Sequence, residues 1–171
     1  MKVIFLDIDG PLAWGTWFDG RLQLDANLTI PYPWLHKECE SLTRIIKATG
    51  ANIVLSSDWR LHYTIDQMHS IFDHYDIPKV IVDCTHTFKA KMSSPGSMDR
   101  ARQILKWVEE KNPESWVAID DYDLEYEFFA EGYKDNYIAT VGDNSAGTTD
   151  TISSREHDII NILNGKNDAI F

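Results

Sequence analysis

Short apolar runs of strand length recur along the chain, and longer stretches of helical periodicity lie between them. The pattern predicts five strands, at residues 2–7, 52–56, 79–83, 116–120 and 136–141. The first, second and fourth runs are β-branched and almost continuously apolar, which is typical of strands buried on both faces of a sheet. Strands that alternate with helices specify a parallel sheet covered on both sides, so we expect a doubly wound, Rossmann-like α/β fold.

Five amphipathic stretches supply the expected helices, at residues 33–49, 64–74, 97–111, 122–131 and 154–163. Thr64 and Gln67 have the spacing of a capping box, and Ser153 and Glu156 repeat that spacing before the last helix. Gly165 supplies a stop signal after it. No internal repeat or linker is visible, so we expect residues 1–171 to form a single domain.

Residues 13–33 do not fit the alternation. They contain short alternating runs around the turn signal Asp19-Gly20, together with Trp14, Trp17 and Phe18. This composition predicts a β-hairpin, or flap, inserted directly after the first strand.

Polar side chains stand where three of the predicted strands end. Ligands of open parallel sheets bind beyond the carboxyl ends of the strands, so these side chains are the candidates for chemistry. Carboxylates gathered there would repel one another unless a cation held them, and oxygen ligands with room for water suit Mg²⁺. The strand-end residues are Asp7 and Asp9, Ser56 and Ser57, and Asp120 and Asp121.

The first acidic pair has the spacing that phosphoryl transfer needs. Asp7 can attack phosphorus to form an aspartyl phosphate. Asp9, two residues on, can protonate the leaving alcohol and later activate water. The sequence therefore predicts a nucleophile and an acid/base, with Asp7, Asp9, Asp120 and Asp121 as metal ligands.

The stretch "FLDIDGPL" resembles the first motif of the haloacid dehalogenase (HAD) superfamily, a hydrophobic strand followed by DxDGT/V-L. "NIVLSSDWR" is similar to the second motif, in which the hydroxyl of Ser56, or of the adjacent Ser57, would bind the phosphoryl group. The resemblance implies a sheet with the strand order 5-4-1-2-3 and, here, no large cap domain. Pro11 departs from the usual Thr or Val and removes a backbone N–H from the motif.

The third motif requires a basic residue near the start of the helix before the last catalytic strand. "SMDRARQILKWV" offers Arg100, with Arg102 as a competitor. The charge of this residue would stabilise the phosphate and the aspartyl phosphate. Lys89 and Lys91 are weaker substitutes, because no helix signal surrounds them.

The fourth motif is an acidic pair after a strand, and "WVAIDDYD" supplies Asp120 and Asp121, with Asp123 as a weaker candidate. "VGDNSAGTTD" resembles the other form of this motif and offers Asp143. That choice would require a basic third-motif residue roughly twenty positions upstream, where the sequence reads "DDYDLEYE".

Within the superfamily, the chain looks most like the Swiss Army Knife RNA repair-like and polynucleotide kinase 3′-phosphatase group. The resemblance implies a Mg²⁺-dependent phosphomonoester hydrolase acting on a nucleotide or on a nucleic-acid terminal phosphate. Ser57, Trp59, Arg60, Trp14 and Trp17 are the candidate substrate-binding residues. The aromatic rings could stack on a base or pack the flap onto the body, and Arg60 could reach a second phosphate or form a surface ion pair.

The net charge of −11 opposes binding along a nucleic-acid backbone, so we expect a small phosphorylated partner and no stable duplex binding. The sequence leaves the oligomeric state open. No apolar run approaches the roughly 18 residues of a membrane span, and the first residues do not resemble a signal peptide. We therefore expect a cytoplasmic protein without a membrane partner, in which Cys39 and Cys84 form no disulfide.

One alternative from another class of protein remains open, namely a HAD-fold binding or regulatory module without turnover. Pro11 is the only feature of the sequence that favours it.

Overall fold

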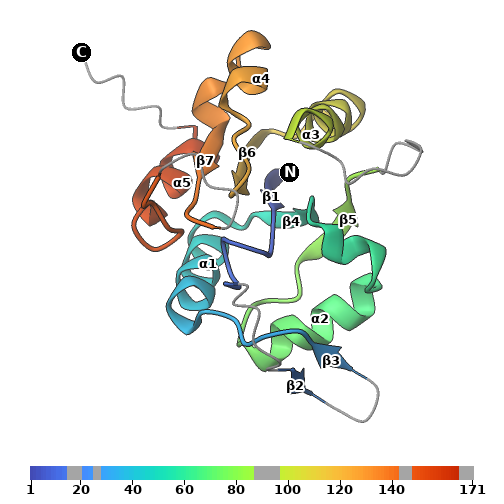
Figure 1. Ribbon diagram of the computed structural model, residues 1–171. Helices are drawn as coiled ribbons and strands as arrows, with labels where there is room; N and C mark the ends of the chain where they lie inside the picture. Colours follow the sequence, from blue (N-terminus) through green and yellow to red (C-terminus); the bar gives the residue numbers. More distant parts are fainter. Residues whose placement is uncertain (15–20, 25–27, 87–96, 143–147, 166–171) are drawn as a thin grey trace.

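A five-stranded, wholly parallel sheet forms the centre of the protein, in the order β5-β4-β1-β6-β7 (Figure 1). The computed structural model describes residues 1–14, 21–24, 28–86, 97–142 and 148–165. The strands are β1 (Lys2–Leu6), β4 (Asn52–Leu55), β5 (Ile81–Cys84), β6 (Ser115–Asp120) and β7 (Tyr137–Ala139). The predicted fold class and strand order are confirmed.

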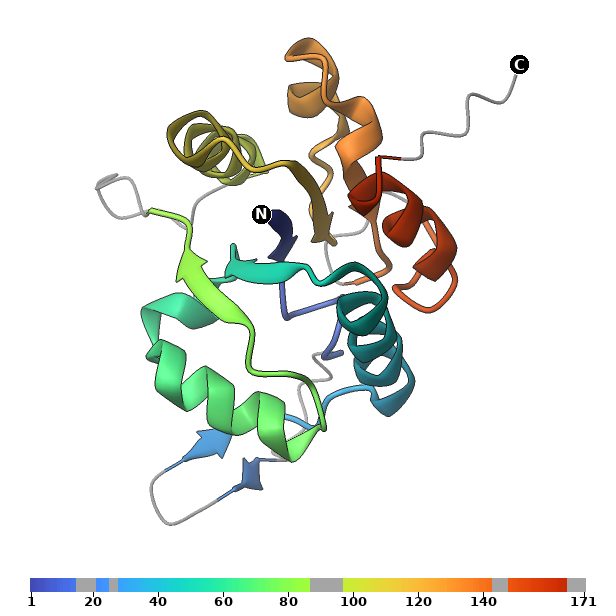
Figure 2. The same cartoon turned by 180° about the vertical axis from the view of Figure 1, so that it is seen from behind.

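Helices cover both faces of this sheet (Figures 1 and 2). Helices α1, α2 and α5 pack on one face, whereas α3 and α4 pack on the other. Among the described residues, no helix combines the length and the apolar composition needed to cross a bilayer. The helices are α1 (His36–Thr49), α2 (Ile65–His74), α3 (Ser97–Lys111), α4 (Glu125–Ala130) and α5 (Glu156–Leu163), with the 3-10 turns η1 (Asp58–Leu61) and η2 (Lys134–Asn136).

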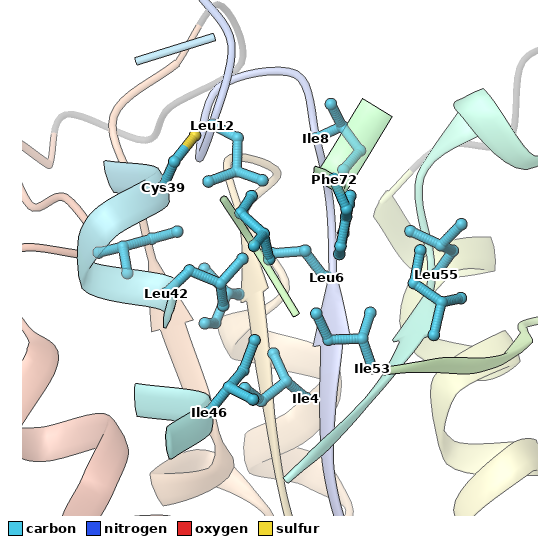
Figure 3. Packing of buried hydrophobic residues seen from close by; sticks show 14 of the residues in the cluster. Ile4, Leu6, Ile8, Leu12, Cys39, Leu42, Ile46, Ile53, Leu55 and Phe72 are labelled. Carbon is cyan, nitrogen blue, oxygen red and sulfur yellow. The ribbon is translucent and has the colours of Figure 1, made fainter. Parts of the chain in front are cut away.

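The side chains of β1 alternate between two hydrophobic clusters, because successive residues of a strand point to opposite faces. Ile4 and Leu6 belong to the larger cluster, beneath α1 and α2 (Figure 3). Val3 and Phe5 belong to the smaller cluster under α3, where the Phe5 ring meets the edge of Trp107 at 5.3 Å between centroids. β1 is therefore buried on both faces, as its continuous apolar run predicts.

The flap contains a short antiparallel pair, β2 (Leu22–Gln23) and β3 (Thr29–Ile30). The Leu24 N–H donates to the Leu28 carbonyl over 3.0 Å, which extends the pairing by one residue beyond each strand. The expected turn at Asp19-Gly20 lies outside the described residues. Residues 13–33 therefore contain an antiparallel pair C-terminal to that turn signal, and a hairpin around Asp19-Gly20 stays a prediction.

Helix starts depend on caps that the sequence predicts only in part. The capping box of Thr64 and Gln67 is present at the start of α2. The corresponding prediction for α5 is wrong, because that helix has Arg155 as its N-cap with no side-chain cap, and Ser153 bonds to Glu38 instead. Helix α4 is shorter than expected, since the turn after β6 occupies residues 121–124.

The carboxylate of Glu38 holds the segment before α5 against α1. It is 5% exposed, and it accepts hydrogen bonds from the Ser153 N–H at 2.7 Å and the Ser153 hydroxyl at 2.9 Å. A Glu38→Gln variant keeps one acceptor oxygen but removes the negative charge, so the hydrogen bonds to Ser153 are no longer charge-assisted. We expect a loss of about 1–3 kcal/mol in the free energy of unfolding, measured by urea denaturation.

The matched control is Glu40→Gln, which changes an exposed carboxylate on the same helix. Its free energy of unfolding should stay within about 0.5 kcal/mol of the parent value. Equal effects of the two variants would contradict the role given to Glu38.

Candidate active site

Three central strands bring their terminal side chains to one edge of the sheet. Leu6 in β1 pairs with Leu55 in β4 and with Ile119 in β6. The ladder continues one residue further, since the Asp7 N–H donates to the Ile119 carbonyl and the Ser56 N–H to the Leu6 carbonyl, both over 3.0 Å. Asp7, Ser56 and Asp120 are thus fixed by main-chain pairing.

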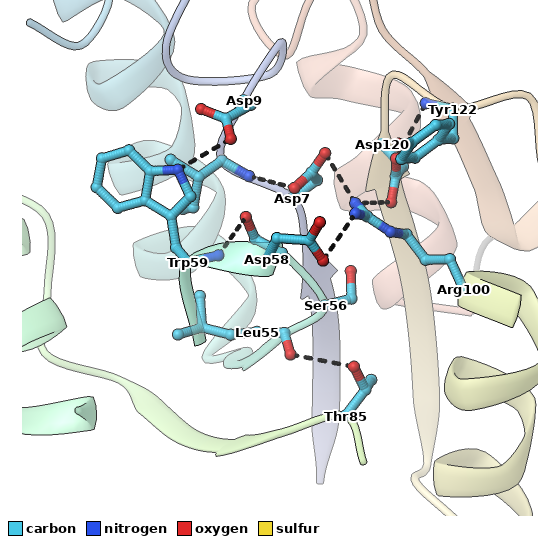
Figure 4. A network of polar contacts seen from close by, with 12 residues as sticks. Asp7, Asp9, Leu55, Ser56, Asp58, Trp59, Thr85, Arg100, Asp120 and Tyr122 are labelled. Carbon is cyan, nitrogen blue, oxygen red and sulfur yellow. Dashed lines mark hydrogen bonds and ion pairs between the residues drawn. The ribbon is translucent and has the colours of Figure 1, made fainter. Parts of the chain in front are cut away.

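Arg100, in the first turns of α3, enters this edge from the side (Figure 4). Its Nη1 lies 2.9 Å from Asp7 Oδ2 and 3.1 Å from Asp120 Oδ2, and all three side chains are buried. The guanidinium carbon lies 4.7 Å from the centre of the Tyr122 ring. The buried Arg100 guanidinium, from the predicted third motif, therefore contacts carboxylates of the first and fourth motifs.

Asp121 completes a buried group of three carboxylates. Oxygen atoms of Asp7, Asp120 and Asp121 all lie within 4.8 Å of one another. Two glycines leave room for Asp121: a Cβ on Gly10, which has φ of +94°, would lie 2.7 Å from Asp121 Cβ, and one on Gly142 would lie 2.4 Å from its Oδ2. The segments that contain Gly10 and Gly142 therefore pack against Asp121 through their main chains, with no side chain in between.

Burial and mutual repulsion govern the protonation of this cluster. Burial raises the pKa of Asp7, with Arg100 opposing and Asp121 adding to the rise. Burial and then the charge of Asp7 raise the pKa of Asp120 well above its usual range. Burial alone would lower the pKa of Arg100, but Asp7 and Asp120 outweigh it and raise that pKa, so the guanidinium remains charged.

The donor set fits a divalent cation. Three buried carboxylates lie close together beside the Arg100 guanidinium, and a bound cation would offset their mutual repulsion. Only oxygen atoms are offered, which is the ligand set that Mg²⁺ prefers. Asp7, Asp120 and Asp121 are the residues that could hold it.

Both serines of the second motif are fully buried. The Ser56 hydroxyl lacks a hydrogen-bond partner in the part of the chain that the structure describes, and it points toward the space beside Asp7 and Arg100 (Figure 4). The Ser57 hydroxyl accepts from the Trp59 N–H at 3.4 Å, and it lowers the pKa of the Asp7 carboxyl. Ser56 therefore keeps a buried donor for a ligand oxygen, whereas Ser57 supports Asp7.

The Asp9 carboxylate lies apart from the three-carboxylate group. Its Oδ2 accepts from the Trp59 indole N–H at 3.0 Å, and its Oδ1 accepts from the Tyr32 hydroxyl. Burial raises the pKa of Asp9, and the Tyr32 hydrogen bond opposes that rise. The structure thus separates Asp9, predicted as a metal ligand, from the other predicted ligands, and the metal-binding role of its side chain stays a prediction.

Arg60 is directed inward, although it was predicted as a substrate contact. Its side chain is 3% exposed and donates to the carbonyls of Ser56, Ser57 and Thr85. Its Nη2 also donates to Gln103 Oε1 at 2.9 Å, one helical turn from Arg100. Arg60 therefore ties the second-motif loop to the helix that carries the third motif.

The competing residues lie elsewhere. Arg102 is exposed on α3, and Asp123 is exposed and accepts from the Glu125 N–H at the start of α4. Trp14 is 49% exposed beside the first motif, whereas Trp59 is 5% exposed. Several candidates lie outside the described residues: Trp17, Phe18, Lys89, Lys91 and Asp143.

Pro11 fits the turn that follows the acidic pair. The Gly10 N–H donates to the Ala13 carbonyl, and the N–H groups of Leu12 and Ala13 donate to the Ile8 carbonyl. The hydrogen bonds of the turn therefore come from the residues on either side of Pro11, and the missing N–H does not disturb it.

Two contacts at the site were not predicted. Tyr32 reaches Asp9 from the C-terminal end of the flap, and Asp58 lies 3.6 Å from Arg100 Nη2. Asp58 follows directly after the predicted second motif, so its position could have been noticed. Tyr32 carries no motif, and only the fold brings it to Asp9.

A family model described as the HAD domain in Swiss Army Knife RNA repair proteins matches residues 3–150. The chain belongs to this family. No curated protein and no solved structure matches it. Membership of the HAD family indicates a phosphatase-type hydrolase, and the family generally uses Mg²⁺.

Gly142 provides a test of the carboxylate group that does not remove a carboxylate. In Gly142→Ala the added methyl would meet both Cβ and Oδ2 of Asp121, at 2.6 and 2.4 Å, and displace that side chain. We expect Mg²⁺ affinity, measured by isothermal titration calorimetry, to fall on the order of tenfold.

The control is Gly50→Asn, at the end of α1, where φ is +68° and a Cβ meets nothing within 4 Å. Asparagine tolerates that left-handed backbone. Unchanged Mg²⁺ affinity in folded Gly142→Ala protein would exclude Asp121 from the metal site.

Proposed function

We propose that the protein is a Mg²⁺-dependent phosphomonoester hydrolase that forms an aspartyl phosphate on Asp7. The supporting observation is the buried contact of Asp7 with Arg100, next to two further carboxylates and a hydroxyl that has no partner among the described residues. These groups match the needs of phosphoryl transfer, which are an oxygen nucleophile, positive charge at the phosphoryl oxygens and a hydroxyl donor.

The side chains divide the reaction between them. An Asp7 oxygen forms the new bond to phosphorus, while the Ser56 hydroxyl and the Arg100 guanidinium donate to phosphoryl oxygens. Asp9 gives its proton to the leaving alcohol and then takes a proton from the water that hydrolyses the acyl phosphate. Mg²⁺, held by Asp7, Asp120 and Asp121, would supply the charge that offsets repulsion between the carboxylates and the phosphate.

The proposed substrate is a nucleotide or the terminal phosphate of a nucleic acid. The matching family is described by its occurrence in RNA repair proteins. A two-stranded flap in place of a large cap would admit bulky phosphate esters, and the exposed ring of Trp14 could stack on a base. The net charge of −11 opposes binding of a long polyanion, so a short single-stranded end suits the protein better than a duplex.

Asp7→Asn should abolish turnover, because an amide is not a nucleophile toward phosphorus. We expect Mg²⁺-dependent phosphate release to fall by at least about 1,000-fold, with the circular dichroism spectrum unchanged. Asp123→Asn, which changes an exposed capping carboxylate near the site, is the matched control and should keep its activity. Retained activity in Asp7→Asn would refute the aspartyl-phosphate mechanism.

A comparison of substrates tests the second part of the proposal. We expect the wild-type protein to release phosphate from nucleoside monophosphates or from a short 3′-phosphorylated oligonucleotide, and only with Mg²⁺. Marked salt dependence with the oligonucleotide alone would identify the nucleic-acid end as the substrate. A broad phosphomonoester panel without any Mg²⁺-dependent release would contradict an enzymatic function.

A further inference from the structure

The Asp9 carboxylate is held by two aromatic side chains that come from different parts of the chain. The Trp59 indole N–H donates to Oδ2 at 3.0 Å, and the Tyr32 hydroxyl donates to Oδ1. Each carboxylate oxygen therefore has one fixed donor, so the plane of the carboxyl group is defined from both sides.

Trp59 is a rigid support for this contact. It lies in η1, directly after the second motif, and is 5% exposed. Its ring stacks on Tyr63 at 5.2 Å between centroids and meets the edge of Trp34 at 5.6 Å. Packing on two sides prevents the indole from turning away from Asp9.

Tyr32 approaches from the flap. It follows β3 by two residues, and its ring meets Trp59 edge-on at 6.5 Å. The Tyr63 hydroxyl donates to the Thr29 carbonyl in β3 at 2.6 Å, so the base of the flap is fixed to the same aromatic group. The position of the flap and the orientation of Asp9 are therefore mechanically linked.

We propose that Tyr32 is a positioning residue, which together with Trp59 aims the Asp9 carboxyl at the leaving oxygen. This inference rests on the proposed function. As the Asp7 oxygen bonds to phosphorus, the bond between phosphorus and the leaving oxygen breaks. Its electron pair stays on that oxygen, which takes the proton from Asp9.

The two donors are suited to a carboxyl group that changes protonation state during turnover. An indole N–H can only donate, so Oδ2 accepts from Trp59 in both protonation states of Asp9. Oδ1 has two lone-pair positions, so Tyr32 can donate to one of them while the other carries the proton that goes to the leaving oxygen. Tyr32 thus serves both half-reactions.

The test compares leaving groups, because proton donation matters most for a basic leaving oxygen. A nucleoside 3′-monophosphate releases a strongly basic alkoxide, whereas para-nitrophenyl phosphate releases a stable phenolate. For Tyr32→Phe we expect kcat/KM to fall about tenfold with the nucleotide and less than about threefold with the aryl ester.

Tyr63→Phe is the matched control, because it removes a hydroxyl that holds the flap but does not touch Asp9. We expect Tyr63→Phe to change kcat/KM by the same factor for both substrates. Adding Tyr32→Phe to an Asp9→Asn protein should cost nothing further in nucleotide turnover, since the group that Tyr32 positions is then gone.

Three results would overturn the inference: equal losses on both substrates in Tyr32→Phe, no loss on either, or an additive loss in the double variant. A wild-type protein that releases no phosphate from these two substrates, from the 3′-phosphorylated oligonucleotide or from the broad phosphomonoester panel would refute the proposed function itself. The two failures are therefore distinguishable.

Discussion

One guanidinium nitrogen placed between two buried carboxylates organises the edge of this sheet. Arg100 Nη1 lies 2.9 Å from Asp7 and 3.1 Å from Asp120, and each of these side chains is at most 4% exposed. An unpaired charge at such a place would cost several kcal/mol, so the ion pairs require one another. The position of the start of α3 relative to the ends of β1 and β6 depends on this contact.

Further hydrogen bonds connect α3, which carries Arg100, to segments outside the carboxylate group. Arg60 ties the second-motif loop to α3 through Gln103, and it also bonds to the Thr85 carbonyl after β5. Strand ends fix Asp7, the proposed nucleophile, and the Ser56 hydroxyl, whereas Asp9 is held by a flap residue and a 3-10 turn. The groups proposed to bind the phosphoryl centre and the proposed acid/base are thus positioned by different elements.

The sequence predicted most of the fold, because β1, β4 and β6 are short, almost purely apolar runs, which is typical of strands buried on both faces of a sheet. Contacts between distant segments were not predictable in this way. Ser153 bonds to Glu38, 115 residues away, rather than capping α5, and Tyr32 reaches Asp9 only because the flap folds back. Local patterns carry no information about such partners.

The same distinction, between local patterns and contacts of distant segments, applies to the candidate site. The strand-end positions of Asp7, Ser56 and Asp120 could be predicted, because parallel strands end at a common edge. The inward direction of Arg60 could not, since a charged residue after a strand is usually at the surface. The close packing of Gly142 against Asp121 also required the three-dimensional structure.

The most direct test of the central claim is chemical trapping of the intermediate. Borohydride reduces an aspartyl phosphate to homoserine, and peptide mass spectrometry locates the modified residue. After mixing with Mg²⁺ and substrate, followed by rapid quenching, we predict homoserine at residue 7 and at no other carboxylate. Homoserine at another residue, or no modification while phosphate is being released, would contradict the account.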